Sequence, residues 1–400
     1  MNILIVHEVD WIKKVTYEIH HLSEIFSKMG HNVYAIDLPD SGFGNIFTKL
    51  SGETIENYSR VYDDASVTLI RPPTIPIKGL NRIFSYFTSY RHIKHILKKY
   101  NIDCVLQYSV VTNGLQTIKA CKECNVPIVH RTFDILHDLI REKYLRTFVK
   151  NQEIKLYSKL DHVVANTKFV KDWVAEFGVN EKNISIIPQG VDNKIMQNLP
   201  WQKNIAEELK ISSDSKIIMY LGTIEEFCGL DELIKNFPQM LTKIPTLKLL
   251  IVGGGSYLPK LQFLSKELHL QNKIIFTGFK PYKEVPEFCS LATLCVNTFR
   301  VNDMTIKLSP VKFYDLQSCG KPVVSTPLEG LKIDFPEEKS GIIYADLEDF
   351  PKKIIELLDN EEKLNTLGLR GKKFVDTNYT WDTVAKQMLK QLTLAIQITK

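Results

Sequence analysis

A dense group of polar side chains follows the apolar run Ile128–Val129. This group contains His130, Asp134 and His137. If the run is a buried strand, these side chains lie at its carboxyl end, where parallel α/β sheets bind ligands. A histidine or carboxylate there can position a hydroxyl group or accept its proton. We take Asp134 and His130 as candidate catalytic residues and His137 as a candidate ligand contact, with a simple helix cap by Asp134 as the alternative.

The segment Leu308–Val324 has the residues expected of a helix whose N-terminus binds an anion. Ser309 is a suitable N-cap and Pro310 a suitable first helical residue. A helix N-terminus that faces a cleft presents free N–H groups to a phosphate. Lys312 adds a positive charge at the same opening, and Asp315 can accept hydrogen bonds from a ribose diol. An ordinary capped surface helix is the alternative.

Glycine-bearing loops follow two other apolar runs. Three consecutive glycines follow Leu247–Val252, and Gly222 with Thr223 follows Lys216–Leu221. Glycine lets the backbone approach a ligand closely. The spacing is not that of the dinucleotide fingerprint, because no third spaced glycine follows. A plain turn between a strand and a helix is therefore the alternative.

The apolar runs predict two parallel α/β sheets. Asn2–Val6, a helical stretch over Tyr17–Lys28 and the run His31–Leu38 form a strand–helix–strand unit. A second series starts at Lys216–Leu221, after a change near Pro188–Asp192. At roughly 150 residues per domain, the 400 residues therefore fit two doubly wound domains. Further strands are expected at Ser66–Ile70, Cys104–Tyr108, His162–Ala165, Ile184–Ile187, Lys273–Thr277, Leu294–Asn297, Pro322–Ser325 and Gly341–Tyr344.

The formal net charge of +5 is too small for a nucleic-acid-binding stripe. One local exception is Lys78–Tyr100, which has six basic residues, no acidic residue and interleaved aromatic side chains. Such a helix can lie on an anionic membrane surface. A solvated helix whose aromatic side chains face the core is the alternative.

The seven cysteines are odd in number and scattered, which indicates a reducing compartment rather than a disulfide framework. Cys121 and Cys124 form one CxxC pair without a second pair of ligands at zinc-site spacing, so we expect core thiols and no metal. The N-terminus lacks the features of a signal peptide, and no run of ~18 apolar residues is present. We expect a cytoplasmic protein and leave attachment to the inner face of the membrane open.

Taken in order, four segments resemble the retaining glycosyltransferases of family 4. They are DHVVANTKFVKDW with IIPQGVD, LLIVGGG with KIIFTGF, SPVKFYDLQSCGKPVVST, and YTWDTVAKQM. The resemblance implies the GT-B fold, in which two Rossmann-like domains face each other across a cleft. It implies an acceptor-binding domain over 1–192, a nucleotide-sugar-binding domain over 193–380, and a helix over 381–400 that crosses back to the first domain.

The resemblance also implies a reaction. A sugar would pass from a nucleotide-diphosphate sugar of the UDP or GDP type to a glycan or lipid-linked acceptor, with retention of configuration and without metal or cofactor. Groups fixed around the leaving diphosphate would supply most of the catalysis. The implied donor-binding residues are Gly222, Thr223, Gly254, Leu308, Ser309, Pro310, Val311, Lys312 and Asp315. Asp10, Trp11, Lys14 and His137 are taken as acceptor-binding, and Asp134, His130 and Lys312 as catalytic.

The sequence departs from the family pattern where the family carries charge. Asp315 matches the second of two usual glutamates, but Lys307 stands at the first. A phenylalanine, Phe133, precedes Asp134 where the family has histidine. The stretch His7–Lys14 replaces the glycine pair that usually follows the first strand.

The two cations that usually bind the phosphates are also missing. Thr223 and Cys228 stand at these positions. A cation ~4 Å from an anion is worth up to ~4 kcal/mol at an effective dielectric near 20, so their loss needs a replacement. We hypothesise that Lys312, Lys307 or Arg300 supplies it. The alternatives to an active glycosyltransferase are a non-catalytic nucleotide-sugar-binding relative, a scaffold partner of another glycosyltransferase, and a nucleotide-sugar epimerase.

Overall fold

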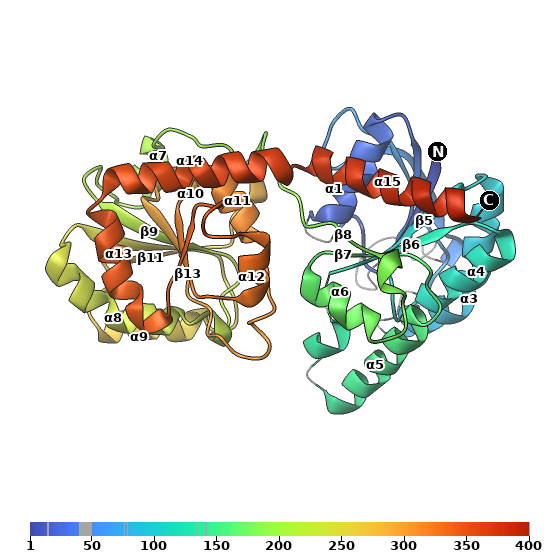
Figure 1. The fold of residues 1–400 in the computed structure, drawn as a ribbon, viewed down its shortest axis with the longest axis horizontal. Helices are drawn as coiled ribbons and strands as arrows, with labels where there is room; N and C mark the ends of the chain where they lie inside the picture. The colour runs from blue at the N-terminus through green and yellow to red at the C-terminus, as the bar shows by residue number, and fades with distance from the viewer. Residues whose placement is uncertain are drawn as a thin grey trace. The chain divides into compact units, whose positions relative to one another are not determined.

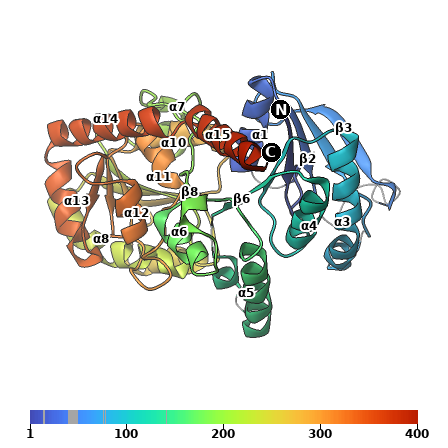
Figure 2. The ribbon, with the colours of Figure 1, turned by 45° about the vertical axis from the view of Figure 1, so that its right-hand side comes forward.

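The computed structural model describes residues 1–13, 16–39, 50–75, 77, 79–133, 135–140 and 142–399. The chain forms two compact units: unit 1 combines Met1–Gln189 with Trp381–Lys400, and unit 2 is Gly190–Thr380. Each unit is a mainly parallel sheet covered by helices, as predicted (Figures 1 and 2). None of the described helices has the length and apolar character needed to cross a bilayer.

Unit 1 contains an eight-stranded sheet in the order β3-β4-β2-β1-β5-β6-β7-β8. The strands are β1 (Asn2–Val6), β2 (Asn32–Ile36), β3 (Glu53–Tyr58), β4 (Val67–Arg71), β5 (Cys104–Gln107), β6 (Ile128–Thr132), β7 (Val163–Ala165) and β8 (Ile184–Ile186). All pairings are parallel except that of β3 with β4. The central strands are continuous apolar runs because helices cover both of their faces.

Alternate side chains of β1 enter two different cores. Ile3 and Ile5 pack with α1 (Glu18–Lys28) and α15 (Trp381–Thr399), which lie side by side in Figure 1. The side chains between and after them pack toward the opposite face. That face is covered by α3 (Leu80–Lys99), α4 (Gly114–Cys124), α5 (Lys143–Tyr157) and α6 (Lys168–Ala175). The remaining short helices of unit 1 are η1 (Leu136–Leu139) and η2 (Glu181–Asn183).

The antiparallel edge strand β3 differs from the sequence prediction, which had no strand over Glu53–Tyr58. Its side chains are mostly exposed, and it pairs with β4 alone. An edge strand of this kind contributes few side chains to the core, so it has no continuous apolar run.

Unit 2 contains a six-stranded parallel sheet in the order β11-β10-β9-β12-β13-β14. The strands are β9 (Lys216–Leu221), β10 (Leu247–Val252), β11 (Ile274–Gly278), β12 (Leu294–Asn297), β13 (Val323–Ser325) and β14 (Ile342–Tyr344). The helices are α7 (Lys203–Glu208), η3 (Glu226–Cys228), α8 (Leu230–Lys243), α9 (Leu258–Glu267), η4 (Tyr282–Glu284), α10 (Val285–Leu291), α11 (Lys312–Ser318), α12 (Glu329–Asp334), η5 (Leu347–Asp349), α13 (Phe350–Leu358) and α14 (Glu361–Asn378). One core spans both faces of this sheet.

The chain enters and leaves unit 2 at neighbouring points. Val191 forms an isolated parallel bridge with Thr380, and its N–H donates to the carbonyl of Tyr379 at 2.8 Å. Beyond this bridge, Trp381 begins α15 and stacks on His21 of α1, with ring centroids 4.7 Å apart. The last helix is thereby tied to unit 1.

Candidate active site

At the carboxyl ends of β9 and β10, two loops pack backbone against backbone. The N–H of Gly222 donates to the carbonyl of Val252 at 2.9 Å. A Cβ at Gly253 would lie 1.9 Å from the Gly222 oxygen, so no larger residue fits there. Gly222 and Gly253 also have φ values of +127° and +144°, which favour glycine. The tight turn left open as the alternative therefore explains these two glycines without a ligand.

Lys312, the first residue of α11, lies beside this loop pair. Its Nζ lies 4.1 Å from the ring centre of Tyr220 and 4.5 Å from that of Phe299. A Cβ placed on Gly222 would lie 3.9 Å from the same nitrogen. Among the described residues, no carboxylate forms an ion pair with Lys312. Burial lowers the pKa of Lys312 to about 7.

The ammonium group of Lys312 has no negatively charged partner among the described residues. A desolvated aromatic ring stabilises an ammonium group by about 2 kcal/mol or more, which replaces only part of the hydration that the group loses on burial. An anion arriving at Nζ would restore the balance and raise the pKa of Lys312 again. The site is therefore suited to a phosphate group.

The other two candidate cations differ from Lys312. Arg300 donates from Nη2 to both carboxylate oxygens of Asp231, at 2.8 and 2.7 Å, and forms an ion pair with Glu232 at 3.2 Å. Its charge is already neutralised within unit 2. Lys307 is exposed, so its ammonium keeps its hydration. Of the three hypothesised replacements, Lys312 alone is half-buried and without a carboxylate partner among the described residues.

Asp315 lies on α11, one turn beyond Lys312. It is buried, and its carboxylate accepts a hydrogen bond from the Tyr282 hydroxyl at 3.0 Å. Burial raises the pKa of Asp315 to about 7. The structure thus supplies a fixed acceptor held by Tyr282, a residue that the sequence analysis did not single out.

The predicted start of α11 was wrong. The helix begins at Lys312 with Val311 as the N-cap residue, and Ser309 does not cap it. Pro310 and Val311 instead form a turn, because their carbonyls accept from the N–H groups of Phe313 and Tyr314. Leu308, which precedes this turn, is half-buried.

In unit 1, the carboxyl ends of three strands are joined by one buried ion pair. Arg131 on β6 donates from Nε and Nη2 to the two carboxylate oxygens of Glu18, both at 2.8 Å. Its Nη1 donates to the carbonyls of Ala165 at 3.0 Å and Ile187 at 2.6 Å. Glu18 opens α1, so the pair fixes this helix to β6, β7 and the end of β8. Both side chains are fully buried and their charges cancel.

An aromatic group lies on this ion pair. The Tyr108 hydroxyl donates to Glu18 at 3.1 Å, and its ring stacks on Phe133 with centroids 5.8 Å apart. The Val9 N–H donates to His7 Nδ1 at 3.3 Å, so a neutral His7 ring carries its proton on Nε2, next to the Tyr17 hydroxyl. Burial raises the pKa of Tyr17, which therefore stays a phenol. Sequence reasoning named none of these rings as site residues.

Two residues predicted to bind the acceptor, Trp11 and Asp10, are buried. Trp11 is 0% exposed, and its backbone N–H donates to Asp37 Oδ1 at 2.7 Å. Asp10 is also buried, and its Oδ1 accepts from the N–H groups of Ile12 and Lys13 at 3.1 and 3.0 Å. The loop after β1 thus folds inward. The loop uses the Asp10 carboxylate and the Trp11 backbone N–H to hold its own shape, so the geometry does not support the ligand contacts predicted for these two residues, which stay predictions.

Neither predicted histidine is accessible for proton transfer. His130 is 0% exposed on β6, and both ring nitrogens lack a hydrogen-bond partner among the described residues. Burial lowers the pKa of His130 to about 3, so it is neutral. His137 is buried, and its Nδ1 lies 2.6 Å from Glu153 Oε2. The catalytic role predicted for His130 is therefore not supported, and His137 is held by Glu153.

Two further predicted residues, Asp134 and Lys14, lie outside the described residues. Within the described part of the chain, no group of three or more His, Cys, Asp or Glu side chains is placed to hold a metal ion.

Comparison with known families covers most of the chain. The profile of the family Glycosyltransferase Family 4 matches residues 17–194, and that of Glycosyl transferases group 1 matches residues 202–374. The chain belongs to the family 4 glycosyltransferases. The break between the two matched segments lies close to the break between units 1 and 2.

Known glycosyltransferases are similar to this one over long stretches. It is 26% identical over 240 residues to an uncharacterised glycosyltransferase of Methanocaldococcus jannaschii, covering 59% of either chain. It is 22% identical over 373 residues to alpha-monoglucosyldiacylglycerol synthase of Streptococcus pneumoniae, covering 91% of this chain and 79% of that one. The chain thus spans less than two thirds of the first relative.

The fold also matches solved structures. HepE of Anabaena in complex with UDP superimposes with a TM-score of 0.74 at 15% identity, over 98% of this glycosyltransferase and 100% of HepE. This likeness identifies the fold as GT-B.

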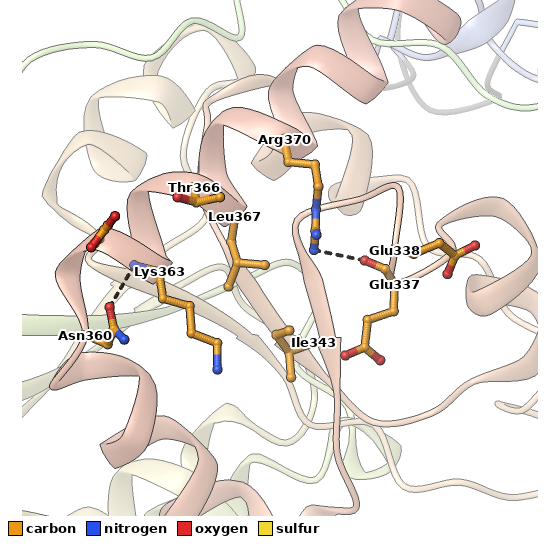
Figure 3. A pocket seen from close by; sticks show the side chains of 9 residues that line it. Glu337, Glu338, Ile343, Asn360, Lys363, Thr366, Leu367 and Arg370 are labelled. Atoms are coloured by element: carbon orange, nitrogen blue, oxygen red, sulfur yellow. Dashed lines mark hydrogen bonds between the residues drawn. The ribbon is translucent and has the colours of Figure 1, made fainter.

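A separate hollow of about 660 Å³ lies at the β14 edge of unit 2 (Figure 3). Arg370 faces Glu337 across it and donates to its carbonyl at 2.9 Å. None of the described residues predicted to bind the donor lines this hollow. The arrangement around Lys312 at the carboxyl ends of the strands remains the candidate site of this glycosyltransferase.

Proposed function

We propose that the protein transfers a sugar from a nucleoside diphosphate sugar to a hydroxyl group of a lipid-linked or glycan acceptor, with retention of configuration and without a metal. The bond between the anomeric carbon and the diphosphate oxygen breaks, and a bond from that carbon to the acceptor oxygen forms. The acceptor proton passes to the departing diphosphate. HepE of similar fold holds UDP, and the pneumococcal relative is named for a glycolipid product.

The observation that carries this proposal is the unpaired ammonium of Lys312. In the family pattern, a lysine at the position of Cys228 binds phosphate. The Cys228 thiol and the Tyr220 hydroxyl both donate to the Thr223 carbonyl, at 3.2 and 2.8 Å, and Lys312 Nζ lies over the ring of the same Tyr220. Lys312 therefore brings a positive charge from α11 to the place that Cys228 left neutral. There it would stabilise the charge that develops on the leaving diphosphate.

The test compares Lys312→Met with Lys307→Met in the full-length protein. Thermal shift with UDP, GDP and ADP sugars identifies the donor, because a ligand at 100 times its Kd adds ~2.7 kcal/mol of stability. Transfer is then measured with that labelled donor and a lipid or glycan acceptor. We expect Lys312→Met to lower kcat/KM by about 100- to 1000-fold and Lys307→Met, on the exposed side of the same segment, to have little effect. Equal kinetics for the two variants would contradict the assignment of Lys312.

The same measurements separate an enzyme from a binding relative. A donor that stabilises the protein but is never transferred or hydrolysed would favour the non-catalytic alternative. Conversion of the donor sugar into its epimer would favour the epimerase.

We further propose that unit 1 rests on an anionic membrane through the N-terminal halves of α3 and α5. Phe87 on α3 and Tyr144 on α5 are 74% and 73% exposed. Both views show α5 projecting from the rest of unit 1 (Figures 1 and 2). The basic residues of the described parts of these helices are Arg82, Arg91, Lys94, Lys98, Lys99, Lys143, Arg146, Lys150 and Lys155. Apolar side chains among basic ones suit a membrane interface, and each charge near it adds ~1 kcal/mol.

These two helices begin at the edge of the sheet where the acceptor would bind. Arg82, in the first turn of α3, donates to the Thr112 hydroxyl at 2.9 Å and to the Glu8 carbonyl at 3.3 Å. Those two residues follow β5 and β1. Sedimentation with phosphatidylglycerol vesicles at low salt tests the proposal. A Phe87→Ser, Tyr144→Ser variant should bind less than wild type, whereas Phe263→Ser in unit 2 should not; equal binding by all three proteins would refute it.

A further inference from the structure

An exposed aromatic ring ends the strand next to the glycine loop. Phe279 directly follows β11 and is 71% exposed. The preceding Gly278 has φ +71°, a left-handed conformation that turns the chain at this point. The turn places Phe279 at the carboxyl edge of the unit 2 sheet, the edge at which Lys312 also lies.

The ring of Phe279 rests on a surface that only glycine provides. A Cβ at Gly254 would lie 2.9 Å from Cε2 and 3.0 Å from Cδ2 of this ring. Any side chain at 254 would therefore displace the ring. Gly222 and Gly253 are explained by contact between their own loops, whereas Gly254 supports an aromatic ring that remains largely exposed.

The ring and Lys312 are spaced for the two ends of one ligand. In the sheet, β10 alone separates β11 from β9, so the ends of β11 and β9 lie about 10 Å apart. The glycine loops fill the space between them, with Gly254 against Phe279 and Gly222 against Lys312. An extended nucleoside diphosphate has a similar length from its base to its terminal phosphate.

The hydrogen bond between Tyr282 and Asp315 provides polar groups that suit a ribose. Tyr282 follows Phe279 by three residues, and its hydroxyl donates to Asp315 at 3.0 Å. The loop that carries the ring therefore also holds the buried carboxylate of α11. This carboxylate lies one turn beyond Lys312 on α11, so the aromatic ring, the carboxylate and the ammonium belong to one loop–helix arrangement that can take a base, a ribose and a diphosphate.

We propose that Phe279 is the platform on which the base of the donor nucleotide stacks. This assignment rests on the proposed function, and it adds the residue that binds the base. Every base presents a π-face, so the ring contributes affinity for both purines and pyrimidines. Choice between bases is left to other contacts.

Calorimetry with UDP, GDP and ribose 5-diphosphate, which lacks a base, tests the assignment. We expect Phe279→Ala to weaken binding of the preferred nucleotide by about 5- to 100-fold and to leave ribose 5-diphosphate unchanged. Phe279→Trp should retain nucleotide affinity. Phe263→Ala removes another ring of unit 2, on α9 and 62% exposed, and should change neither affinity. Unchanged melting temperatures show that the variants are folded.

Two results would overturn the stacking role. One is unchanged nucleotide binding by Phe279→Ala, and the other is an equal loss for the nucleotide and for ribose 5-diphosphate. If either occurs while Lys312→Met still abolishes binding of all three ligands, stacking fails and the proposed function stands. If the wild-type protein binds none of them, the proposed function and the stacking role fail together.

Discussion

At the carboxyl ends of the unit 2 strands, Lys312 has no carboxylate partner among the described residues, whereas at the same edge of unit 1 Glu18 and Arg131 neutralise each other. Both edges are rich in aromatic rings. The difference lies in what each edge lacks. At the unit 2 edge no anion pairs with Lys312, while at the unit 1 edge the charges of Glu18 and Arg131 are paired and hydroxyl groups and rings remain. Such edges suit a charged donor on one unit and a neutral hydroxyl acceptor on the other.

The largest expected effect is on the ion pair of unit 1. Glu18→Gln removes the charge that balances Arg131 in the interior, and we expect a loss of about 3–5 kcal/mol in the free energy of unfolding. Urea unfolding followed by tryptophan fluorescence measures it. The signal reports mainly on unit 1, which contains Trp11, Trp173 and Trp381 of the 4 tryptophans.

The control for this prediction is the double variant Glu18→Gln, Arg131→Met, which removes both charges. It should recover part of the lost stability, because no uncompensated charge remains buried. A double variant less stable than Glu18→Gln would show that Arg131 acts mainly through the carbonyls of Ala165 and Ile187, and the contrast between the two edges would weaken.

The next effect is a pH dependence of donor binding. Lys312 has a pKa of about 7 without ligand, and the bound diphosphate favours the ammonium form. Affinity for the donor should therefore be greatest below about pH 7 and fall by up to ~10-fold per pH unit above it. Calorimetry with a nucleotide sugar, whose diphosphate does not titrate near neutral pH, measures this slope.

Lys312→Arg sharpens the test, because a guanidinium stays charged throughout this range. Its binding curve should be flat with pH, even if its affinity is lower. A slope that persists in this variant would assign the titration to another group.

The smallest effect concerns His130. Its ring is neutral and makes no hydrogen bond, so Met at this position loses little beyond shape. We expect His130→Met to change kcat/KM by less than about fivefold, which corresponds to ~1 kcal/mol, and to keep or raise the melting temperature. A large loss of activity in a fully stable variant would show that His130 takes part in catalysis. It would contradict the comparison between the two edges.

Most of the fold could be predicted from local apolar runs. The strands β1, β9 and β10 have the predicted bounds, because strands buried on both faces need no partner pattern to be recognised. The edge strand β3 was missed because most of its side chains are exposed to solvent and it pairs with one neighbour. Its sequence, ETIENY, therefore has no apolar run. Its pairing with β4 depends on distant residues that local sequence does not report.

The site was predicted unevenly for a similar reason. Lys312 could be named from its place in the first turn of a helix, since that position depends on nearby residues. Trp11 looked equally suited to ligand contact. Its position depends on Asp37, 26 residues further along the chain, whose carboxylate accepts a hydrogen bond from the Trp11 backbone N–H. The role of Glu18 could not be predicted from the sequence, because its partner Arg131 is distant along the chain. Residue type predicts what a side chain can bind, and long-range contacts decide what it does bind.

The placement of α15 has a consequence for synthesis on the ribosome. Unit 1 is covered on its α1 face by residues made after the whole of unit 2, including Met388 and Leu392. At about 5–20 residues per second, unit 1 waits roughly 10–40 s for its final helix after Gln189 has been added. During that interval its α1 face is open to chaperones, and the first half of the chain becomes native only after the second.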